Sequence, residues 1–217
     1  MFLIDGEHMV EEAAGAGQKI HHIIAEEDYT FTFDASDFEV IHVTPPVMKS
    51  LSQLETPQGI MAAVSYVQPE ASGKKVLVLD DVQDPGNLGS LIRTADAFGF
   101  DRVVASPGTV DPFSDKVLRS AQGSTFHISV EVSDIKAVIE DFPGLSIGTS
   151  LGDADYLEDM PDEDALLIVL GNEGRGVSRE VLDLVDRKVK IHMPGRSESL
   201  NVAIAGGILM HHFKSHN

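Results

Sequence analysis

The pattern of apolar and polar residues divides the chain into two regions. In the first region, short apolar runs at 2–4, 19–25, 39–43 and 59–66 predict β-strands, and apolar residues at helical spacing predict helices at 7–14 and 46–54. These elements describe a small α/β unit. A unit of roughly 65 residues buries too little apolar surface to be an obvious enzyme on its own.

The second region repeats one pattern, an apolar run followed by a helix. The runs lack the polar alternation of a strand that has one face in water, so they predict a parallel sheet covered by helices on both faces. Ligands of such sheets bind at the carboxyl ends of the strands. The predicted strands are 76–79, 102–105, 128–132, 145–148, 166–170 and 188–191, and all except the fourth precede a predicted helix.

A polar stretch with proline and glycine, QPEASGKK (68–75), separates the two regions. This composition is typical of a linker. We therefore expect two domains, a small one at 1–70 and a larger one at 74–217.

The first of three loops that follow predicted strands is DDVQDPGNLGSLIRTADAFG (80–99). Asn87 is a favoured N-cap residue, and Gly99 ends the helix. Arg93 lies off the apolar stripe, beside the small residues Gly89 and Ser90, which leave a helix face that a bulky substrate could approach. A solvated arginine beside a carboxylate is the alternative. The stripe is formed by Leu88, Leu91, Ile92, Ala95 and Phe98.

The second loop, IVLGNEGRGVS (168–178), places glycines directly after a strand. Its glycine spacing fits neither the P-loop nor the dinucleotide fingerprint GxGxxG. The carboxylate of Glu173 would also repel a pyrophosphate, so the loop suits a neutral or cationic ligand. A tight turn joining strand and helix, with Ser178 as N-cap, is the alternative.

The third loop and its helix form the stretch IHMPGRSESLNVAIAGGILM (191–210). Ser199 is the expected N-cap of a helix that is apolar on all sides. Adjacent glycines inside a helix cost about 1 kcal/mol each relative to alanine, so another element must pack closely there. That element belongs to the same domain, to a neighbouring subunit, or to both. The small residues are Ala203, Ala205, Gly206 and Gly207.

The chain is strongly acidic, with 16 Lys and Arg against 35 Asp and Glu. The net charge is 2 − 12 = −10 before Gly73 and 14 − 23 = −9 after it. A nucleic-acid partner is normally met by a basic field. Solvation by a carboxylate-rich surface, as in salt-adapted proteins, accounts for the acidity. Steering of RNA then depends on local clusters, namely Lys116 with Arg119, Arg175 with Arg179, and Arg196.

Several kinds of site and location are not expected. Cysteine is absent, which excludes disulfides and thiolate chemistry. No apolar stretch approaches the roughly 20 residues that span a bilayer, and no secretory signal opens the chain, so we expect a soluble cytoplasmic protein without a membrane partner. No metal is expected either. The histidines at 21, 22, 211, 212 and 216 lack a carboxylate framework, and the acidic stretch 153–164 lacks the spacing of a calcium loop and is expected to face solvent.

The three loops resemble the three sequence motifs of the SpoU (TrmH) group of SPOUT RNA ribose 2′-O-methyltransferases. The matching stretches are NLGSLIRTA (87–95), LGNEGRG (170–176) and PGRSESLNVA (194–203), and the likeness extends from Lys75 to the C-terminus. The first region, with FLIDGEHMVEEA (2–13) and TPQGI (56–60), is similar to the small α/β, ribosomal-protein-like substrate-binding domain of many rRNA-directed members.

The resemblance implies an α/β trefoil-knot (SPOUT) domain with a parallel sheet, a homodimer, and S-adenosylmethionine as methyl donor. The donor is a sulfonium cation without phosphates, which suits a glycine loop that contains Glu173. Residues of the second and third loops would hold the donor in the knot. The implied donor-binding residues are Thr149, Gly171, Ile191, Pro194 and Leu200.

The resemblance also implies roles for five polar residues. Arg93 would promote attack by the ribose 2′-hydroxyl, as a base or by stabilising the developing alkoxide. Asn87 and Asn201 would orient Arg93 or the ribose. Glu173 would fix its loop or a substrate hydroxyl, and Ser199 would supply a further hydrogen bond. No metal is needed for this transfer, in which alignment supplies much of the acceleration.

The expected function is methylation of a ribose 2′-hydroxyl in RNA, with ribosomal RNA as the expected substrate. Two alternatives remain open: a tRNA ribose methyltransferase, and a non-catalytic paralogue that binds RNA or the cofactor. A dinucleotide-dependent oxidoreductase is disfavoured because GxGxxG is missing.

Overall fold

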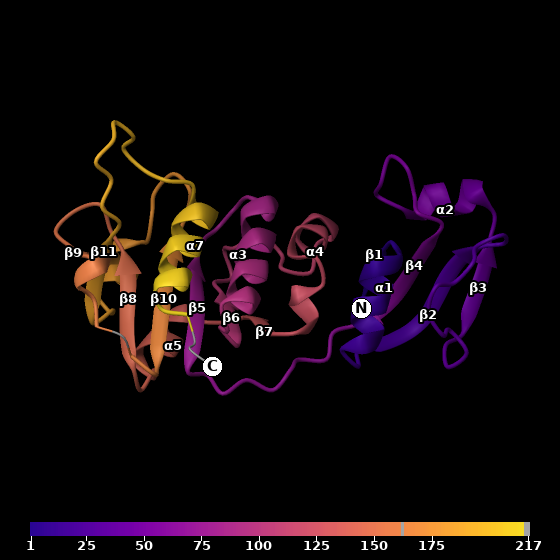
Figure 1. Ribbon diagram of the computed structural model, residues 1–217, viewed down its shortest axis with the longest axis horizontal. Helices are drawn as coiled ribbons and strands as arrows, with labels where there is room; N and C mark the ends of the chain where they lie inside the picture. Colours follow the sequence, from indigo (N-terminus) through magenta and orange to yellow (C-terminus); the bar gives the residue numbers. More distant parts are fainter. Residues whose placement is uncertain (162, 215–217) are drawn as a thin grey trace.

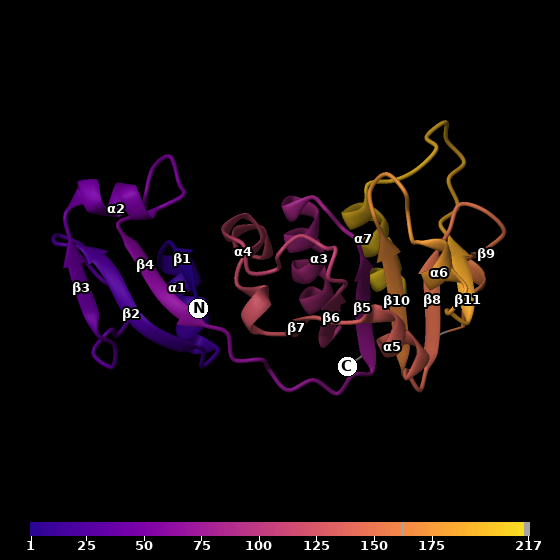
Figure 2. The same ribbon diagram turned by 180° about the vertical axis from the view of Figure 1, so that it is seen from behind.

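The computed structural model describes residues 1–161 and 163–214, which form two β-sheets with their helices (Figure 1). Figure 2 shows from behind that the N-terminal sheet lies at one end of an elongated molecule and that one segment connects it to the larger sheet. Helices α4 (Asp115–Ala121) and α3 (Pro85–Ala97) lie between the N-terminal part and the middle of the larger sheet. No helix in the described ranges is long and apolar enough to cross a membrane.

The N-terminal sheet has the strand order β1-β4-β2-β3. Strand β4 pairs antiparallel with β1 and β2, whereas β3 pairs parallel with β2. Its elements are those that the apolar pattern predicts, with shifted ends; the second helix stops at Leu51 because Ser52 already has extended backbone angles. The elements are β1 (Phe2–Asp5), α1 (Glu7–Gly15), β2 (Lys19–Glu26), β3 (Val40–Val43), α2 (Pro45–Leu51) and β4 (Ile60–Ser65).

The larger sheet has the strand order β7-β6-β5-β10-β8-β11-β9, and its strands pair in parallel. The predicted parallel sheet is confirmed. Its predicted strands are β5 (Lys75–Asp80), β6 (Arg102–Ala105), β7 (Ser129–Val132), β8 (Leu145–Thr149), β10 (Leu166–Gly171) and β11 (Arg187–Lys190). The remaining helices are α5 (Ile135–Glu140), α6 (Arg179–Leu182) and α7 (Val202–His212).

The apolar pattern does not predict the edge strand β9 (Asp155–Tyr156), which pairs with β11. It is two residues long and lies within the acidic stretch, so it contains no apolar run from which a strand could be predicted. The 3₁₀ helix η2 (Leu157–Asp159) follows, and Leu157 and Met160 are buried in the core. The carboxylates of this stretch are exposed as expected, apart from Asp162, which lies outside the described residues.

Strand β5 is buried on both faces, which explains its lack of polar alternation. Successive side chains of a strand point to opposite faces of the sheet. Leu77 and Leu79 pack with α3 and α7 on one face, while Val76 and Val78 pack with α5 and α6 on the other. All four side chains are fully buried.

Two helix starts differ from the prediction. Helix α3 begins after Asp84, whose Oδ1 accepts the main-chain N–H of Asn87 at 2.8 Å, so Asp84 and not Asn87 is the N-cap. Helix α7 begins after Asn201, whose Oδ1 accepts two N–H groups of the first turn at 2.9 and 3.3 Å. Asn201 and not Ser199 is therefore its N-cap. In α3, Pro85 at the first helical position favours the earlier start.

The sequence predicts an open helix face beside Arg93, but at Gly89 this face is covered by α4 and the prediction is wrong there. A Cβ atom at Gly89 would lie 2.4 Å from the Cβ of Ser120 and 2.5 Å from the carbonyl oxygen of Val117. Gly89 therefore allows α4 to pack closely against α3. Only the Ser90 side of this turn is exposed.

Helix α7 packs closely against its own chain at Gly206. A Cβ atom there would lie 2.4 Å from Leu91 Cδ2 on α3 and 2.7 Å from Leu170 Cδ1 on β10. The glycine thus lets α7 lie against both elements. On another side of the helix, Ile204 is 57% and Ile208 38% exposed, so docking of this side on a second subunit stays a prediction.

The two sheets are in contact as well as covalently joined. The hydroxyl of Tyr66 donates to Ile128 O at 3.1 Å and accepts the N–H of Val130 at 2.8 Å. Burial raises the pKa of Tyr66 to about 12, so the hydroxyl stays protonated. Leu118 of α4 and Phe126 of the 3₁₀ helix η1 (Ser124–Phe126) extend the core of the N-terminal sheet. The domain boundary between 70 and 74 stays a prediction.

Candidate functional site

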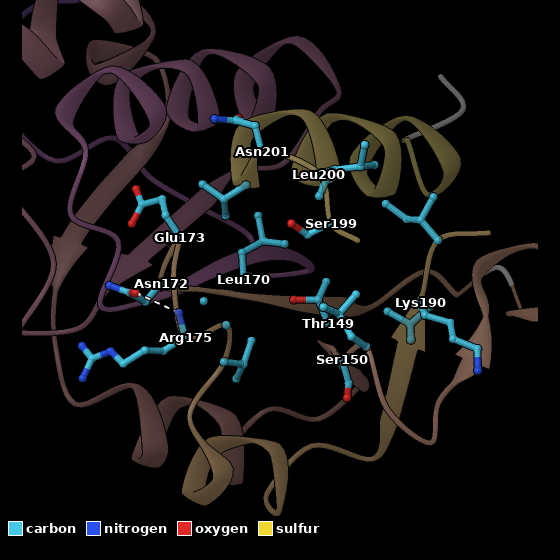
Figure 3. Close-up of a pocket in the computed structure, with 18 of the residues that line it drawn as sticks. Thr149, Ser150, Leu170, Asn172, Glu173, Arg175, Lys190, Ser199, Leu200 and Asn201 are labelled. Atoms are coloured by element: carbon cyan, nitrogen blue, oxygen red, sulfur yellow. Dashed lines mark hydrogen bonds between the residues drawn. The ribbon is translucent and has the colours of Figure 1, made fainter. Parts of the chain in front are cut away.

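A pocket of about 610 Å³ opens at the carboxyl ends of β8, β10 and β11 (Figure 3). Ligands of parallel sheets bind at this edge, and the volume falls within the usual range for small-molecule sites. The walls are the end of β8, the glycine loop after β10, and the segment between β11 and α7 together with the first turns of α7.

Most of the predicted site residues line this pocket. Pro194, an expected donor-binding residue, does not; its neighbour Met193 does. Asn87 is connected to the lining by hydrogen bonds, and Arg93 lies outside it. The predicted residues that line the pocket are Thr149, Gly171, Ile191, Leu200, Glu173, Ser199 and Asn201.

The glycine loop keeps its shape through Asn172. The Oδ1 of Asn172 accepts the N–H groups of residues 174 and 175 at 3.0 and 3.1 Å, and its Nδ2 donates to Asp81 O at 2.9 Å. Its main chain exchanges two hydrogen bonds with Gly176, at 3.1 and 2.8 Å. The alternative interpretation as a tight turn is correct for the backbone, since Ser178 is the N-cap of α6. The same turn forms one wall of the pocket.

Three side chains, one from each predicted loop, form a continuous hydrogen-bonded chain. Asn201 Nδ2 donates to Asn87 Oδ1 at 2.9 Å, and Asn87 Nδ2 donates to Glu173 Oε1 at 3.0 Å. The main-chain N–H groups of Asp84 and Gln83 also donate to Glu173, at 3.0 and 3.1 Å. Each amide can have only one orientation, because the capping role of Asn201 uses its oxygen and leaves its NH₂ for Asn87.

The carboxylate of Glu173 is held in its ionised form. Partial burial raises its pKa, but the hydrogen bonds from the Asn87 side chain and from the main chain of Asp84 and Gln83 outweigh burial and lower the pKa below the ordinary 4.5. A lowered pKa in the folded protein stabilises the loop above pH 4.5, and this contribution is lost as the pH falls through the lowered value. Glu173 therefore fixes the glycine loop against the start of α3.

We expect Glu173→Gln to weaken this connection at neutral pH. A carboxylate accepts from all three donors, whereas glutamine has one acceptor oxygen and turns its NH₂ group toward another donor. A donor left without a partner costs about 1–3 kcal/mol when it is buried and less in this partly exposed position. Thermal melts from pH 3 to 8 measure the effect: wild type should lose stability relative to the variant as the pH falls below 4.5. Parallel pH curves would contradict this role.

Arg93 has no partner within the described part of the chain. It is exposed on α3, and no hydrogen bond or ion pair involves its guanidinium. The alternative of a solvated arginine beside a carboxylate is therefore correct in its exposure of Arg93 and wrong in the carboxylate partner, which the described residues do not provide. Arg93 also does not reach the pocket of its own chain.

The sequence prediction missed Asp81, and it assigned Arg175 to RNA steering and not to the pocket. Arg175 lines the pocket and forms an ion pair with Asp81, whose backbone has φ +63°. Few residues other than glycine adopt this conformation, and Asp is one that tolerates it. Gln83 Nε2 donates to the other oxygen of Asp81 at 2.8 Å. The doubled aspartate at 80–81 after an apolar strand was the available signal.

The histidines do not form a metal site in the described residues. No group of three His, Asp or Glu side chains there could hold a metal ion. His211 lies 3.3 Å from Lys214 Nζ and against the ring of Phe98. His216, which we considered with His212, lies outside the described residues.

Comparison with protein families matches both parts of the chain. Residues 74–211 match the model of the SpoU rRNA Methylase family, and residues 1–62 match the MRM3-like substrate binding domain. The first match covers the larger sheet and the pocket. The chain belongs to the SpoU methylase family, as its three loops predict.

A curated relative extends this likeness over nearly the whole chain. The 23S rRNA (guanosine(2553)-2′-O)-methyltransferase RlmP of Bacillus subtilis (strain 168) is 38% identical over 219 residues, which cover 98% of this chain and 88% of that protein. The chain is thus similar to a ribosomal RNA methyltransferase in both of its parts.

Solved structures share the arrangement of both sheets. An rRNA methyltransferase from Sinorhizobium meliloti, solved with AdoMet bound, is 26% identical and matches with a TM-score of 0.82 over 97% of this chain and 85% of that one. The SpoU methyltransferase AviRb from Streptomyces viridochromogenes, in complex with AdoMet, is 24% identical and has the same fold, with a TM-score of 0.86 over 97% and 88%. The SpoU fold class is thereby confirmed; the knot stays a prediction.

Proposed function

We infer that the protein transfers a methyl group from S-adenosylmethionine to a ribose 2′-hydroxyl of RNA. The observation that carries this inference is the pocket whose walls come from the second and third family motifs, tied to the first by the Asn201–Asn87–Glu173 chain. The likeness to RlmP supports ribosomal RNA, and specifically 23S rRNA, over tRNA. The non-catalytic alternative is disfavoured because Asn87, Arg93, Glu173 and Asn201 are all present.

The residues of the pocket fit the donor. Ile191, Leu200 and Val202 offer an apolar surface for a planar base, while the main chain of the glycine loop offers hydrogen-bonding groups. Glu173 contributes a carboxylate on the pocket wall, which favours a cation and disfavours a phosphate. S-adenosylmethionine supplies an electrophilic methyl group on sulfur when bound. Thr149, Gly171, Ile191 and Leu200 hold the donor in this proposal, and Pro194 shapes the loop beside Met193.

Arg93 acts on the acceptor in this proposal. Its guanidinium has no partner among the residues that the structure describes, and its five N–H donors can stabilise the alkoxide that develops on the ribose and bind the adjacent phosphate. Asn87 and Asn201 belong to the chain that fixes the glycine loop, so we assign them a positioning role. Ser199, exposed on the pocket rim, supplies a hydrogen bond to the substrate.

We propose that a second copy of the chain completes each site. Arg93 does not line the pocket of its own chain, although the reaction needs it beside the donor. The exposed Ile204 and Ile208 on α7, close to the pocket, offer an apolar surface for a homodimer. The region 1–70 binds the RNA, the region 74–217 carries the reaction, and both act in the cytoplasm, where ribosomes are assembled.

Donor binding and methyl transfer test the function together. Calorimetry with purified protein should detect S-adenosylmethionine and its demethylated product, and NADH should not bind. Incubation with radiolabelled donor should label an unmodified 23S rRNA transcript at a ribose. If a tRNA transcript is labelled instead, the substrate is tRNA and not ribosomal RNA. Labelling of a base would contradict the assignment as a ribose 2′-O-methyltransferase. Binding without transfer to either RNA would favour the non-catalytic paralogue.

A further inference from the structure

The arginines expected to steer RNA are mostly neutralised by carboxylates. An arginine that already pairs with an aspartate has little net charge to offer a phosphate. Three arginines of the clusters predicted from the sequence are therefore paired, whereas Lys116 and Arg196 have no side-chain partner in residues 1–161 and 163–214. The pairs are Arg119 with Asp115, Arg175 with Asp81, and Arg179 with Asp183.

Lys116 differs from these arginines. It is exposed at the start of α4, and no carboxylate in the described residues pairs with it. Its helix neighbours Asp115 and Arg119 pair with each other and are partly buried. Like Arg196, Lys116 is therefore a cation without a partner in the described ranges of a strongly acidic molecule.

Lys116 lies on the side of α4 that faces α3. Ser120, one helical turn later on the same side, packs against Gly89 of α3, and its hydroxyl donates to Lys116 O at 2.9 Å. Helix α3 carries Asn87 in its first turn and the unpaired Arg93 two turns further on. Lys116 and Arg93 thus both flank the seam between α3 and α4.

This seam lies between the N-terminal sheet and the pocket. Figure 1 shows the order N-terminal sheet, α4, α3 and α7 along the molecule, and the pocket begins at α7. The N-terminal part has 2 basic and 12 acidic residues before Gly73, so it offers phosphates few cations. An RNA that contacts both the N-terminal part and Arg93 on α3 passes α4, which lies between them (Figure 1).

The overall charge does not prevent such local binding. Exposed charges are largely screened beyond the Debye length, which is about 8 Å at physiological salt. A phosphate held at the seam therefore responds mainly to the few charges beside it. A cation beside the phosphate therefore affects binding more than the net charge of the molecule does.

We propose that the substrate RNA backbone crosses the α3–α4 seam and that Lys116 binds one of its phosphates. The proposal rests on the proposed RNA methyltransferase function and adds the path of the RNA to it. Lys116 touches neither the donor pocket nor the Asn201–Asn87–Glu173 chain, so its effect is on RNA affinity and not on donor binding.

The test compares Lys116→Gln with Lys74→Gln in the intact protein. Lys74 is also exposed and unpaired in the described chain, but it lies just before β5, at the edge of the sheet opposite the pocket. Both variants change the net charge equally, so repulsion by the acidic surface changes similarly and only the position of the lost cation differs. Binding of an unmodified 23S rRNA transcript is measured from 50 to 300 mM KCl.

We expect Lys116→Gln to weaken RNA binding about three- to tenfold at 0.1 M salt and to lower the slope of log affinity against log salt by about 0.7–1. Lys74→Gln should leave the RNA affinity and the salt slope within error of wild type. Lys116→Arg keeps the positive charge, so it should have the affinity and the slope of wild type. Equal effects of the two glutamine variants would overturn the proposal. Calorimetry with S-adenosylmethionine distinguishes failure of the proposed RNA path from failure of the proposed function. If the wild-type protein binds neither the donor nor RNA, the methyltransferase function itself is rejected.

Discussion

Arg93→Ala should abolish methyl transfer while leaving the affinity for S-adenosylmethionine within about twofold of wild type, because Arg93 acts on the acceptor and not on the donor. The side chain is exposed, has no hydrogen bond or ion pair in the described residues and lies outside the pocket, so truncation breaks no polar contact there. Loss of a group that stabilises a developing oxyanion typically costs about 10²–10³ in kcat. Single-turnover transfer and calorimetry measure the two quantities separately.

A mixed-dimer experiment tests whether Arg93 acts on the site of the other subunit. The second variant is Thr149→Trp, whose ring would fill the pocket while Arg93 remains intact. Each variant alone should be inactive. If Arg93 acts across the interface, random mixing should restore about a quarter of wild-type activity, because half of the dimers are mixed and one site in each is complete.

Mixing should restore nothing if Arg93 serves its own chain, since no chain then has both parts intact. Arg93→Lys adds a test of the chemistry. Lysine keeps the charge but not the planar fork of donors, so it should recover only a small part of the rate. Full activity of Arg93→Ala would remove Arg93 from the mechanism.

Gly171→Ala should eliminate measurable donor binding. A Cβ atom at Gly171 would lie 2.1 Å from Gly176 C and 2.1 Å from Val177 N, which are backbone atoms that no rotamer change can move. The glycine loop must open to make room for the side chain of the alanine. Because this loop forms one wall of the pocket, the pocket changes shape with it. We expect a loss of at least about 100-fold in donor affinity and a destabilisation of about 1–3 kcal/mol, as for overpacked interiors.

The matched variant is Gly174→Ala in the same loop. A Cβ atom there would meet only Asn172 Oδ1, at 3.6 Å, which is an ordinary contact. Gly174→Ala should therefore melt like wild type and keep donor affinity within a few-fold. Calorimetry and thermal melts on the three proteins are the measurement. Wild-type affinity in Gly171→Ala would mean that the closed loop is not needed for the donor.

The sequence predicts which residues lie at the site better than it predicts the contacts that these residues make. Glycine spacing and the carboxylate of Glu173 argue against a phosphate ligand before any fold is known, and the pocket lining agrees with most of the donor-binding residues. Pro194 was the exception, because the order of residues along an irregular loop does not say which of them turns inward. The N-caps failed for a related reason: Asp84 and Asn87, like Ser199 and Asn201, are all good capping types, and only the local backbone selects one.

The sequence by itself determined the strands other than β9, their burial on both faces and the loops that carry the polar residues, because apolar periodicity depends on neighbours a few positions apart. Only the tertiary structure decided that Asn201 donates to Asn87 across 114 positions, that Gly89 accommodates α4, and that Arg119 and Arg175 pair with aspartates while Lys116 has no partner in the described part of the chain. These contacts depend on which helix packs beside which strand. Residue spacing along the chain carries no information on such distances, since the packed core brings together segments that the sequence separates.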